Sequence, residues 1–173
     1  MIEISDVRGA DGVVDVAALR RVYGRFPTGV MAVAALEDGE PIGIAASSFN
    51  TVSMDPPLVV VSIQKNSATW PKIAASERIG LSIVSEHQET LTRQLAARGL
   101  DDRFVGAEWE ATGHGAVLVD GAAAWLECSV YSVTEAGDHD LVLLKVLRQG
   151  TNSQELPLIF HDSAFHGIAL KEE

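Results

Sequence analysis

The sequence is poor in cysteine and in positive charge. Cys128 is the single cysteine among 173 residues, so neither a disulfide within the chain nor a cysteine metal cluster can form. It lies in an apolar run, which is typical of a buried, unreactive thiol. Acidic residues outnumber basic ones, 24 to 13, and the formal net charge is -11. Such a chain repels nucleic acid and anionic lipid surfaces, so we expect neither as a partner.

Long apolar runs and the common site motifs are also missing. No run reaches the roughly 20 apolar residues of a membrane-spanning helix, and the acidic N-terminus does not resemble a signal peptide. We therefore expect a cytoplasmic protein. There is no GxGxxG after a predicted strand, no P-loop, no HExxH and no CxxC. The five histidines, at positions 87, 114, 139, 161 and 166, show no tight metal-ligand spacing, so we expect no metal.

The chain instead contains many short apolar runs separated by turn residues. Helices are predicted at residues 16–23, after Ser67, and from Ser85 toward Ala97. The strands do not alternate regularly with these helices, which argues against a doubly wound sheet. The pattern favours a mainly β (α+β) fold, a barrel with peripheral helices, in one domain over residues 1–173. Strands are predicted at 30–36, 42–46, 58–61, 79–84, 122–134, 140–147 and 156–160.

Residues 41–65 contain two of these runs and a row of small polar residues. The adjacent Pro56 and Pro57 cannot donate ladder hydrogen bonds, so the runs at 42–46 and 58–61 are predicted to be separate strands. The polar residues between the runs satisfy backbone groups in many turns. They are equally suited to form a polar wall for a planar, hydrogen-bonding ligand. The row consists of Ser47, Ser48, Asn50, Thr51 and Ser53.

A candidate anion site follows directly, at residues 65–69. Lys65 supplies a positive charge, and Ser67 and Thr69 place hydroxyls beside the free N–H groups of a predicted helix start. Such N–H groups and the helix dipole bind phosphate. The alternative is an ordinary helix cap beside a solvated lysine. One ligand with a flat ring and a phosphate would join this site to the polar wall.

Five motifs occur in an order that is typical of one family. Together they resemble the flavin reductase-like family over about residues 16–168. These are small NAD(P)H:flavin oxidoreductases that supply reduced flavin to two-component monooxygenases. The resemblance implies a split β-barrel that binds FMN and forms a homodimer, with the flavin held non-covalently between subunits. The motifs are FPTGV at 26–30, GIAASSFNTVSMDPPLVVVSI at 43–63, DRFVG at 102–106, DGAAAWLEC at 120–128 and GDH at 137–139.

The resemblance also implies contact residues for both ligands. The isoalloxazine ring would be lined by Ile44, Ala45, Ser47 and Ser48. The ribityl chain and phosphate would be held by Ser62, Ile63, Gln64, Lys65, Ser67, Ala68 and Thr69. The site would be closed by Arg103 and Phe104. The nicotinamide would be bordered by His139, His161 and Phe165.

The expected function is the reduction of FMN or FAD by NADH or NADPH, with release of reduced flavin to a partner monooxygenase. Hydride transfer between two rings needs positioning rather than a side-chain acid or nucleophile. The absence of a catalytic triad or carboxylate pair therefore agrees with this function. Two alternatives remain at this point. One is a flavoprotein that keeps its flavin and oxidises or reduces an organic substrate, and the other is a non-enzymatic flavin-binding module.

Overall fold

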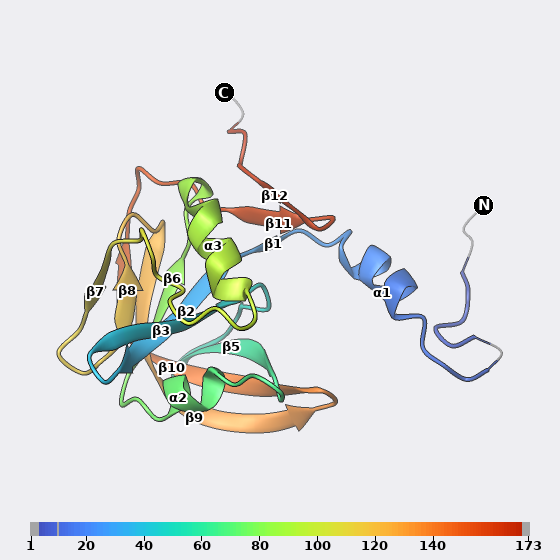
Figure 1. The fold of residues 1–173 in the computed structure, drawn as a ribbon, viewed down its shortest axis with the longest axis horizontal. Coiled ribbons are helices and arrows are strands. Elements are labelled where there is room, and N and C mark those ends of the chain that lie inside the picture. Colours follow the sequence, from blue (N-terminus) through green and yellow to red (C-terminus); the bar gives the residue numbers. More distant parts are fainter. Residues whose placement is uncertain (1–3, 10, 171–173) are drawn as a thin grey trace.

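The computed structural model describes residues 4–9 and 11–170. It is mainly β, with few helices, as predicted. Among the described residues, no helix is long and apolar enough to cross a membrane. Seven antiparallel strands form the central sheet, in the order β3-β2-β6-β9-β10-β5-β4 (Figure 1). Their bounds are β2 Met31–Glu37, β3 Glu40–Ala46, β4 Asn50–Met54, β5 Pro57–Gln64, β6 Ile79–Ile83, β9 Ala124–Ala136 and β10 His139–Thr151.

Strand β2 is buried on both faces, which explains its unbroken apolar sequence. Met31, Val33 and Ala35 point into one apolar cluster, and Ala32 and Ala34 point into the other. Successive strand residues face opposite sides, so a strand with cover on both sides has no position for a polar side chain. The two clusters fill the inside of the curled sheet and the space between its outer face and the surrounding elements.

The sheet curls until its two ends approach each other. Strands β3 and β4 are consecutive in the chain yet lie at opposite ends of the strand order. Ser48, in the link between them, joins the ends: its Oγ accepts a hydrogen bond from the Ser62 N–H (2.9 Å) and donates one to the Ser62 carbonyl (3.1 Å). The polar row of residues 47–53 thus does two things. Ser48 bonds the segment after β3 to strand β5, and the residues from Asn50 on form the unpredicted strand β4.

Among the described residues, two α-helices and a 3-10 turn lie beside the sheet, and a third helix lies apart from it. Helix α3 (Glu89–Ala96) follows the turn η1 (Glu86–Gln88) and packs on β3 through Leu91 and Leu95. Gln88 Oε1 accepts from the Ser85 N–H at 3.0 Å, as the capping-box spacing predicts. Helix α2 (Trp70–Ala74) has only five residues. Helix α1 (Val16–Tyr23) is capped by Asp15, buries no residue and lies apart from the sheet (Figure 1).

Two smaller sheets add strands that the sequence did not predict. Strands β7 (Trp109–Ala111) and β8 (Val117–Val119) form a hairpin where no strand was predicted. The predicted strand at 156–160 is shorter, as β11 (Ile159–His161), and pairs with β12 (Ala164–His166) and β1 (Thr28–Gly29). Strands of two or three residues carry too little alternation to be recognised from the sequence.

Candidate functional site

A cavity of about 610 Å³ opens where the two ends of the curled sheet meet. We call it the seam cavity. Strand ends of β3 and β5 form one wall, the segment before α2 forms a second, and the end of α3 with the following loop forms a third. Its lining residues are Ile44, Ala45, Ala46, Ser47, Ser48, Ser62, Ile63, Gln64, Asn66, Ser67, Ala68, Thr69, Leu95, Ala96, Ala97, Arg98, Gly99, Arg103 and His139.

Most of the residues assigned by resemblance lie on this cavity, although they come from five separate segments of the chain. Those on it are Ile44, Ala45, Ser47, Ser48, Ser62, Ile63, Gln64, Ser67, Ala68, Thr69, Arg103 and His139. Four others, Lys65, Phe104, His161 and Phe165, are not among its lining residues. The ligand contacts of both groups remain predictions.

The wall from the end of α3 was not foreseen. It contributes Leu95, Ala96, Ala97, Arg98 and Gly99. Apart from the apolar face of α3, these residues carry no motif, and the packing of α3 on β3 is what brings them to the cavity. The one feature of this stretch that could have indicated a binding site is Arg98, the arginine that follows the last turn of α3.

Lys65 lies in a cluster of carboxylates rather than on the cavity. Its Nζ is 3.0 Å from Glu135 Oε2 and 4.0 Å from Asp140 Oδ1. Its own backbone N–H donates to the Asp138 carbonyl at 3.0 Å. These contacts attach the end of β5 to the tip of the β9–β10 hairpin, which gives Lys65 a structural role.

The predicted anion site at the start of α2 is weaker than the sequence suggested. The Trp70 N–H already donates to Ser67 Oγ at 3.1 Å, which uses one of the free N–H groups. The N-cap position itself is held by Thr69, without a side-chain hydrogen bond, and not by Ser67 as predicted. The helix that follows has only five residues, and a short helix has a small dipole. What the segment still offers to the cavity is polar side chains, those of Asn66, Ser67 and Thr69.

Arg103 is fixed against the wall by two carbonyl groups. Its Nη1 donates to the Gly43 carbonyl at 2.9 Å and lies 3.4 Å from the Leu95 carbonyl. The neighbouring Phe104 is buried behind Gly43, and a Cβ at position 43 would lie 2.9 Å from Phe104 Cζ. A glycine is therefore needed at this position, because the ring and the strand approach too closely for any side chain.

His139 brings a titratable ring to the cavity at the start of β10. Its Nδ1 is 2.7 Å from Asp138 Oδ1 in the turn before the strand. The hydrogen bond and the charge of the ring lower the pKa of the Asp138 carboxyl. When Nδ1 carries the proton and donates it to Asp138, Nε2 remains a hydrogen-bond acceptor. The Gly-Asp-His turn thus holds the imidazole ring of His139 in a defined orientation.

His161 and Phe165 lie on the β11–β12 hairpin. The Phe165 ring is 5.3 Å from the Phe160 ring, and the Arg93 guanidinium lies 4.9 Å from the centre of the Phe165 ring. Phe165 therefore packs against the outer face of α3. Within one copy of the described chain, the Phe165 ring therefore has protein neighbours that explain its position, and no ligand is needed for it.

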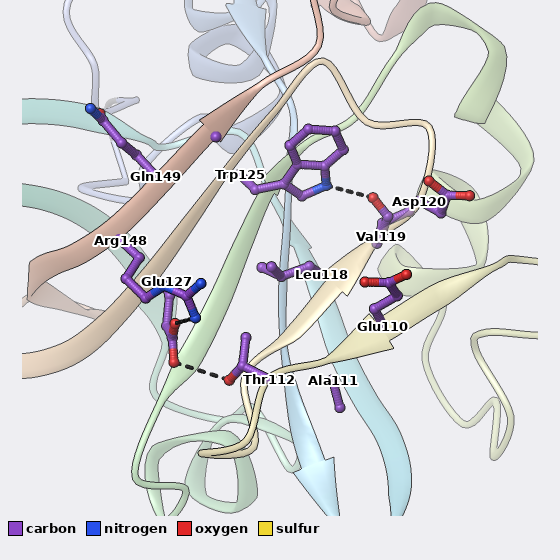
Figure 2. A pocket seen from close by; sticks show the side chains of 11 residues that line it. Glu110, Ala111, Thr112, Leu118, Val119, Asp120, Trp125, Glu127, Arg148 and Gln149 are labelled. Carbon is purple, nitrogen blue, oxygen red and sulfur yellow. Dashed lines mark hydrogen bonds and ion pairs between the residues drawn. The ribbon is translucent and has the colours of Figure 1, made fainter.

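A second cavity, of about 470 Å³, lies between the β7–β8 hairpin and strands β9 and β10. We call it the β7–β8 cavity. Figure 2 shows Glu127 on its floor, hydrogen-bonded by Thr112 Oγ1 at 3.0 Å and paired with Arg148 Nη1 at 3.2 Å. Trp125 Nε1 donates to the Val119 carbonyl. Behind this floor, burial and the Glu127 charge raise the pKa of Cys128 to about 12. The Arg148 guanidinium in this cavity is thus paired with a carboxylate of the chain itself.

Comparisons with known proteins agree with the geometry. The chain is 34% identical over 157 residues to a flavin reductase of Pseudomonas putida, covering 90% of this chain and 92% of that protein. It is 38% identical over 137 residues to the reductase component of the flavin-dependent trigonelline monooxygenase of Acinetobacter baylyi. That match covers 79% of this chain but only 44% of the longer relative.

Solved structures give the same result. The NADH:FAD oxidoreductase SgcE6 of Streptomyces globisporus C-1027, solved with NAD and FAD fragments, superposes with a TM-score of 0.87 at 30% identity. The superposition covers 98% of this chain and all of that one. The family description "Flavin reductase like domain" matches residues 23–169. The chain therefore belongs to the flavin reductase-like family.

Proposed function

We propose that this protein uses NADH or NADPH to reduce FMN or FAD and releases the reduced flavin to a flavin-dependent monooxygenase. The observation that carries the proposal is the seam cavity, which gathers twelve of the residues assigned to the two ligands: Ile44, Ala45, Ser47, Ser48, Ser62, Ile63, Gln64, Ser67, Ala68, Thr69, Arg103 and His139. Its volume of about 610 Å³ lies in the range of small-molecule sites. The trigonelline monooxygenase reductase component supports the monooxygenase as the acceptor of the flavin.

The residues of the cavity fit a flavin. Ile44, Ala45 and Ile63 supply apolar surface for a flat ring, while Ser47 and Gln64 supply hydrogen-bonding groups at its margin. Ser48 acts indirectly, because both hydrogen bonds of its hydroxyl go to Ser62 and hold the wall together. A bound flavin supplies the hydride-accepting ring. The chain's own residues bind and orient the two rings and exclude water between them.

His139 would orient the nicotinamide. It is held by Asp138 at 2.7 Å, and an Nε2 acceptor in a fixed position suits the amide N–H of a carboxamide. His161 and Phe165 would contribute to the same region only from a neighbouring copy of the chain or after movement of the β11–β12 hairpin. We retain them as proposed nicotinamide neighbours on the resemblance alone.

We further propose a split β-barrel that functions as a homodimer in the cytoplasm, where nicotinamide cofactors are available. The closure of the curled sheet through Ser48 and Ser62 supports the barrel. Apolar side chains that lack cover support the second copy, since exposed apolar patches mark interaction surfaces. Met54 at the end of β4 is 91% exposed, and the half of the β9–β10 hairpin nearer its turn exposes Val130, Tyr131, Val133 and Leu141.

The test is a steady-state assay of NADH and NADPH oxidation with FMN or FAD in excess over the protein. We expect turnover of many flavins per protein molecule, followed as loss of nicotinamide absorbance. Anaerobic ultrafiltration then separates free reduced flavin from the protein. The absence of oxidation with every combination would refute the reductase. Turnover in which the reduced flavin stays with the protein would instead show a flavoprotein that keeps its flavin.

A further inference from the structure

The seam cavity contains positive charge that the chain itself leaves uncompensated. Two arginines line it, Arg98 and Arg103, and neither lies within ion-pair distance of a carboxylate among residues 4–9 and 11–170. Their partners are uncharged oxygens. In a chain with a formal net charge of -11, two such guanidinium groups at one cavity point to an anionic ligand.

The two arginines are held to different degrees. Arg103 is half-buried and is fixed by the carbonyls of Gly43 and Leu95, so it completes the wall. Arg98 is exposed and has one long hydrogen bond, from Nη2 to Gln64 Oε1 at 3.3 Å. It follows the end of α3 and precedes Gly99, whose φ is +69°. Arg98 can therefore turn toward a ligand without breaking a strong contact, while Gln64 keeps it at the cavity.

The other cation near the cavity is not available in the same way. Lys65 has Glu135 at 3.0 Å and Asp140 at 4.0 Å, and it does not line the cavity. Two carboxylates offset its single charge. A phosphate near Lys65 would have to compete with both of them, whereas a phosphate near Arg98 would replace only a neutral amide oxygen.

We propose that Arg98 is the residue that binds the phosphate of the flavin, and that it makes the protein favour FMN and FAD over riboflavin. The planar guanidinium can donate two hydrogen bonds to one phosphate. The polar side chains of Asn66, Ser67 and Thr69 line the same cavity and can donate to the remaining phosphate oxygens. This inference rests on the proposed function, since it names a residue that selects the ligand in the same cavity.

The test compares three variants that each remove one positive charge: Arg98→Gln, Lys65→Gln and, on a distant surface, Arg78→Gln. Dissociation constants for FMN and for riboflavin are measured with each by quenching of flavin fluorescence, at low and at high salt. We expect Arg98→Gln to weaken FMN binding roughly 10-fold or more, with riboflavin unchanged. Arg98→Lys should recover part of the loss, because the charge returns without the two-pronged geometry. Lys65→Gln and Arg78→Gln should leave the ratio of the two constants unchanged.

The outcomes separate this inference from the proposed function. Equal losses for FMN and riboflavin in Arg98→Gln, or no loss for either, would overturn the role of Arg98 even if the wild-type protein oxidises NADH with added flavin. A selective loss of FMN in Lys65→Gln would transfer the role to Lys65. If the wild-type protein binds neither flavin, the proposed function fails as well.

Discussion

Both cavities contain arginine side chains, but their partners differ in charge. In the β7–β8 cavity, Arg148 is paired with the buried Glu127, which is only 3% exposed and is also bonded by Thr112 (Figure 2). In the seam cavity, Arg98 and Arg103 have only amide and carbonyl oxygens as partners. A buried carboxylate needs its partner in order to be tolerated at all, so the first pair is structural. Positive charge left over in the second cavity is available to a ligand. Cavity volume alone does not separate the two, whereas the pairing of charges does.

The largest expected difference between the two cavities is in how fast a cysteine beside each of them reacts. Cys128, behind the β7–β8 cavity, has a pKa raised from 9.0 to about 12 by burial and by Glu127. Because the thiolate is the reactive form, this difference of about three pH units lowers the alkylation rate at pH 8 roughly 1000-fold relative to the unfolded chain. The rate is measured with iodoacetamide with and without urea.

Since the pKa of Cys128 is higher in the folded state, the thiol's contribution to the free energy of unfolding is full below pH 9 and is lost as the pH rises toward 12.

A cysteine placed in the seam cavity provides the contrast. Ser67→Cys in a Cys128→Ser background should react readily, because position 67 is partly exposed at the cavity. Added FMN should slow this reaction. Rapid labelling of native Cys128 at pH 8 would show that reagents reach this thiol in the folded protein, and it would remove the contrast between a buried thiol and an accessible one.

Filling each cavity in turn should have a large effect at one of them only. Ala68→Trp places an indole in the seam cavity, and Glu110→Trp, opposite Leu118, places one in the β7–β8 cavity; both positions are exposed. Obstruction of a site costs about 3 kcal/mol, so Ala68→Trp should weaken flavin binding by roughly 100-fold. Glu110→Trp should leave the dissociation constant of FMN within twofold of the wild-type value. Flavin titrations of the two folded variants measure the difference, and a comparable loss in Glu110→Trp would show that the flavin does not bind in the seam cavity alone.

The smallest effects come from removing one hydroxyl at each cavity. Ser48→Ala deprives the Ser62 N–H and carbonyl of their partner, and Thr112→Val deprives Glu127 of one donor. Each should lower the free energy of unfolding by about 1–2 kcal/mol, which is measured by urea denaturation. Ser48→Ala should also weaken flavin binding several-fold because the cavity wall loosens. Thr112→Val should not affect flavin binding, and a loss there equal to that of Ser48→Ala would argue that the two cavities are coupled.

The extent to which the site could be predicted follows from how each residue reaches it. Residues 44–48, 62 and 63 belong to one continuous motif, and residues 64–69 follow it directly. The ends of β3 and β5 and the segment after β5 therefore bring these side chains to the cavity. Arg98 reaches the cavity only because α3 packs on β3 through Leu91 and Leu95. Lys65 lies within the same motif region, yet Glu135 and Asp140, some seventy residues later, turn it away from the cavity. The motif at residues 43–63 therefore identified the cavity, but it did not show that Arg98 rather than Lys65 lines it.

The sequence by itself determined the mainly β character, the family, six of the seven central strands and the buried thiol. These depend on local alternation, on turn residues and on short motifs, which need no knowledge of distant neighbours. Tertiary structure alone decided the contact between Ser48 and Ser62, the strand β4, the short strands β7, β8 and β12, and the partners of each arginine and lysine. Those features depend on which side chains meet across the folded chain. For a charged group, the identity of that neighbour decides whether its charge is neutralised or left for a ligand.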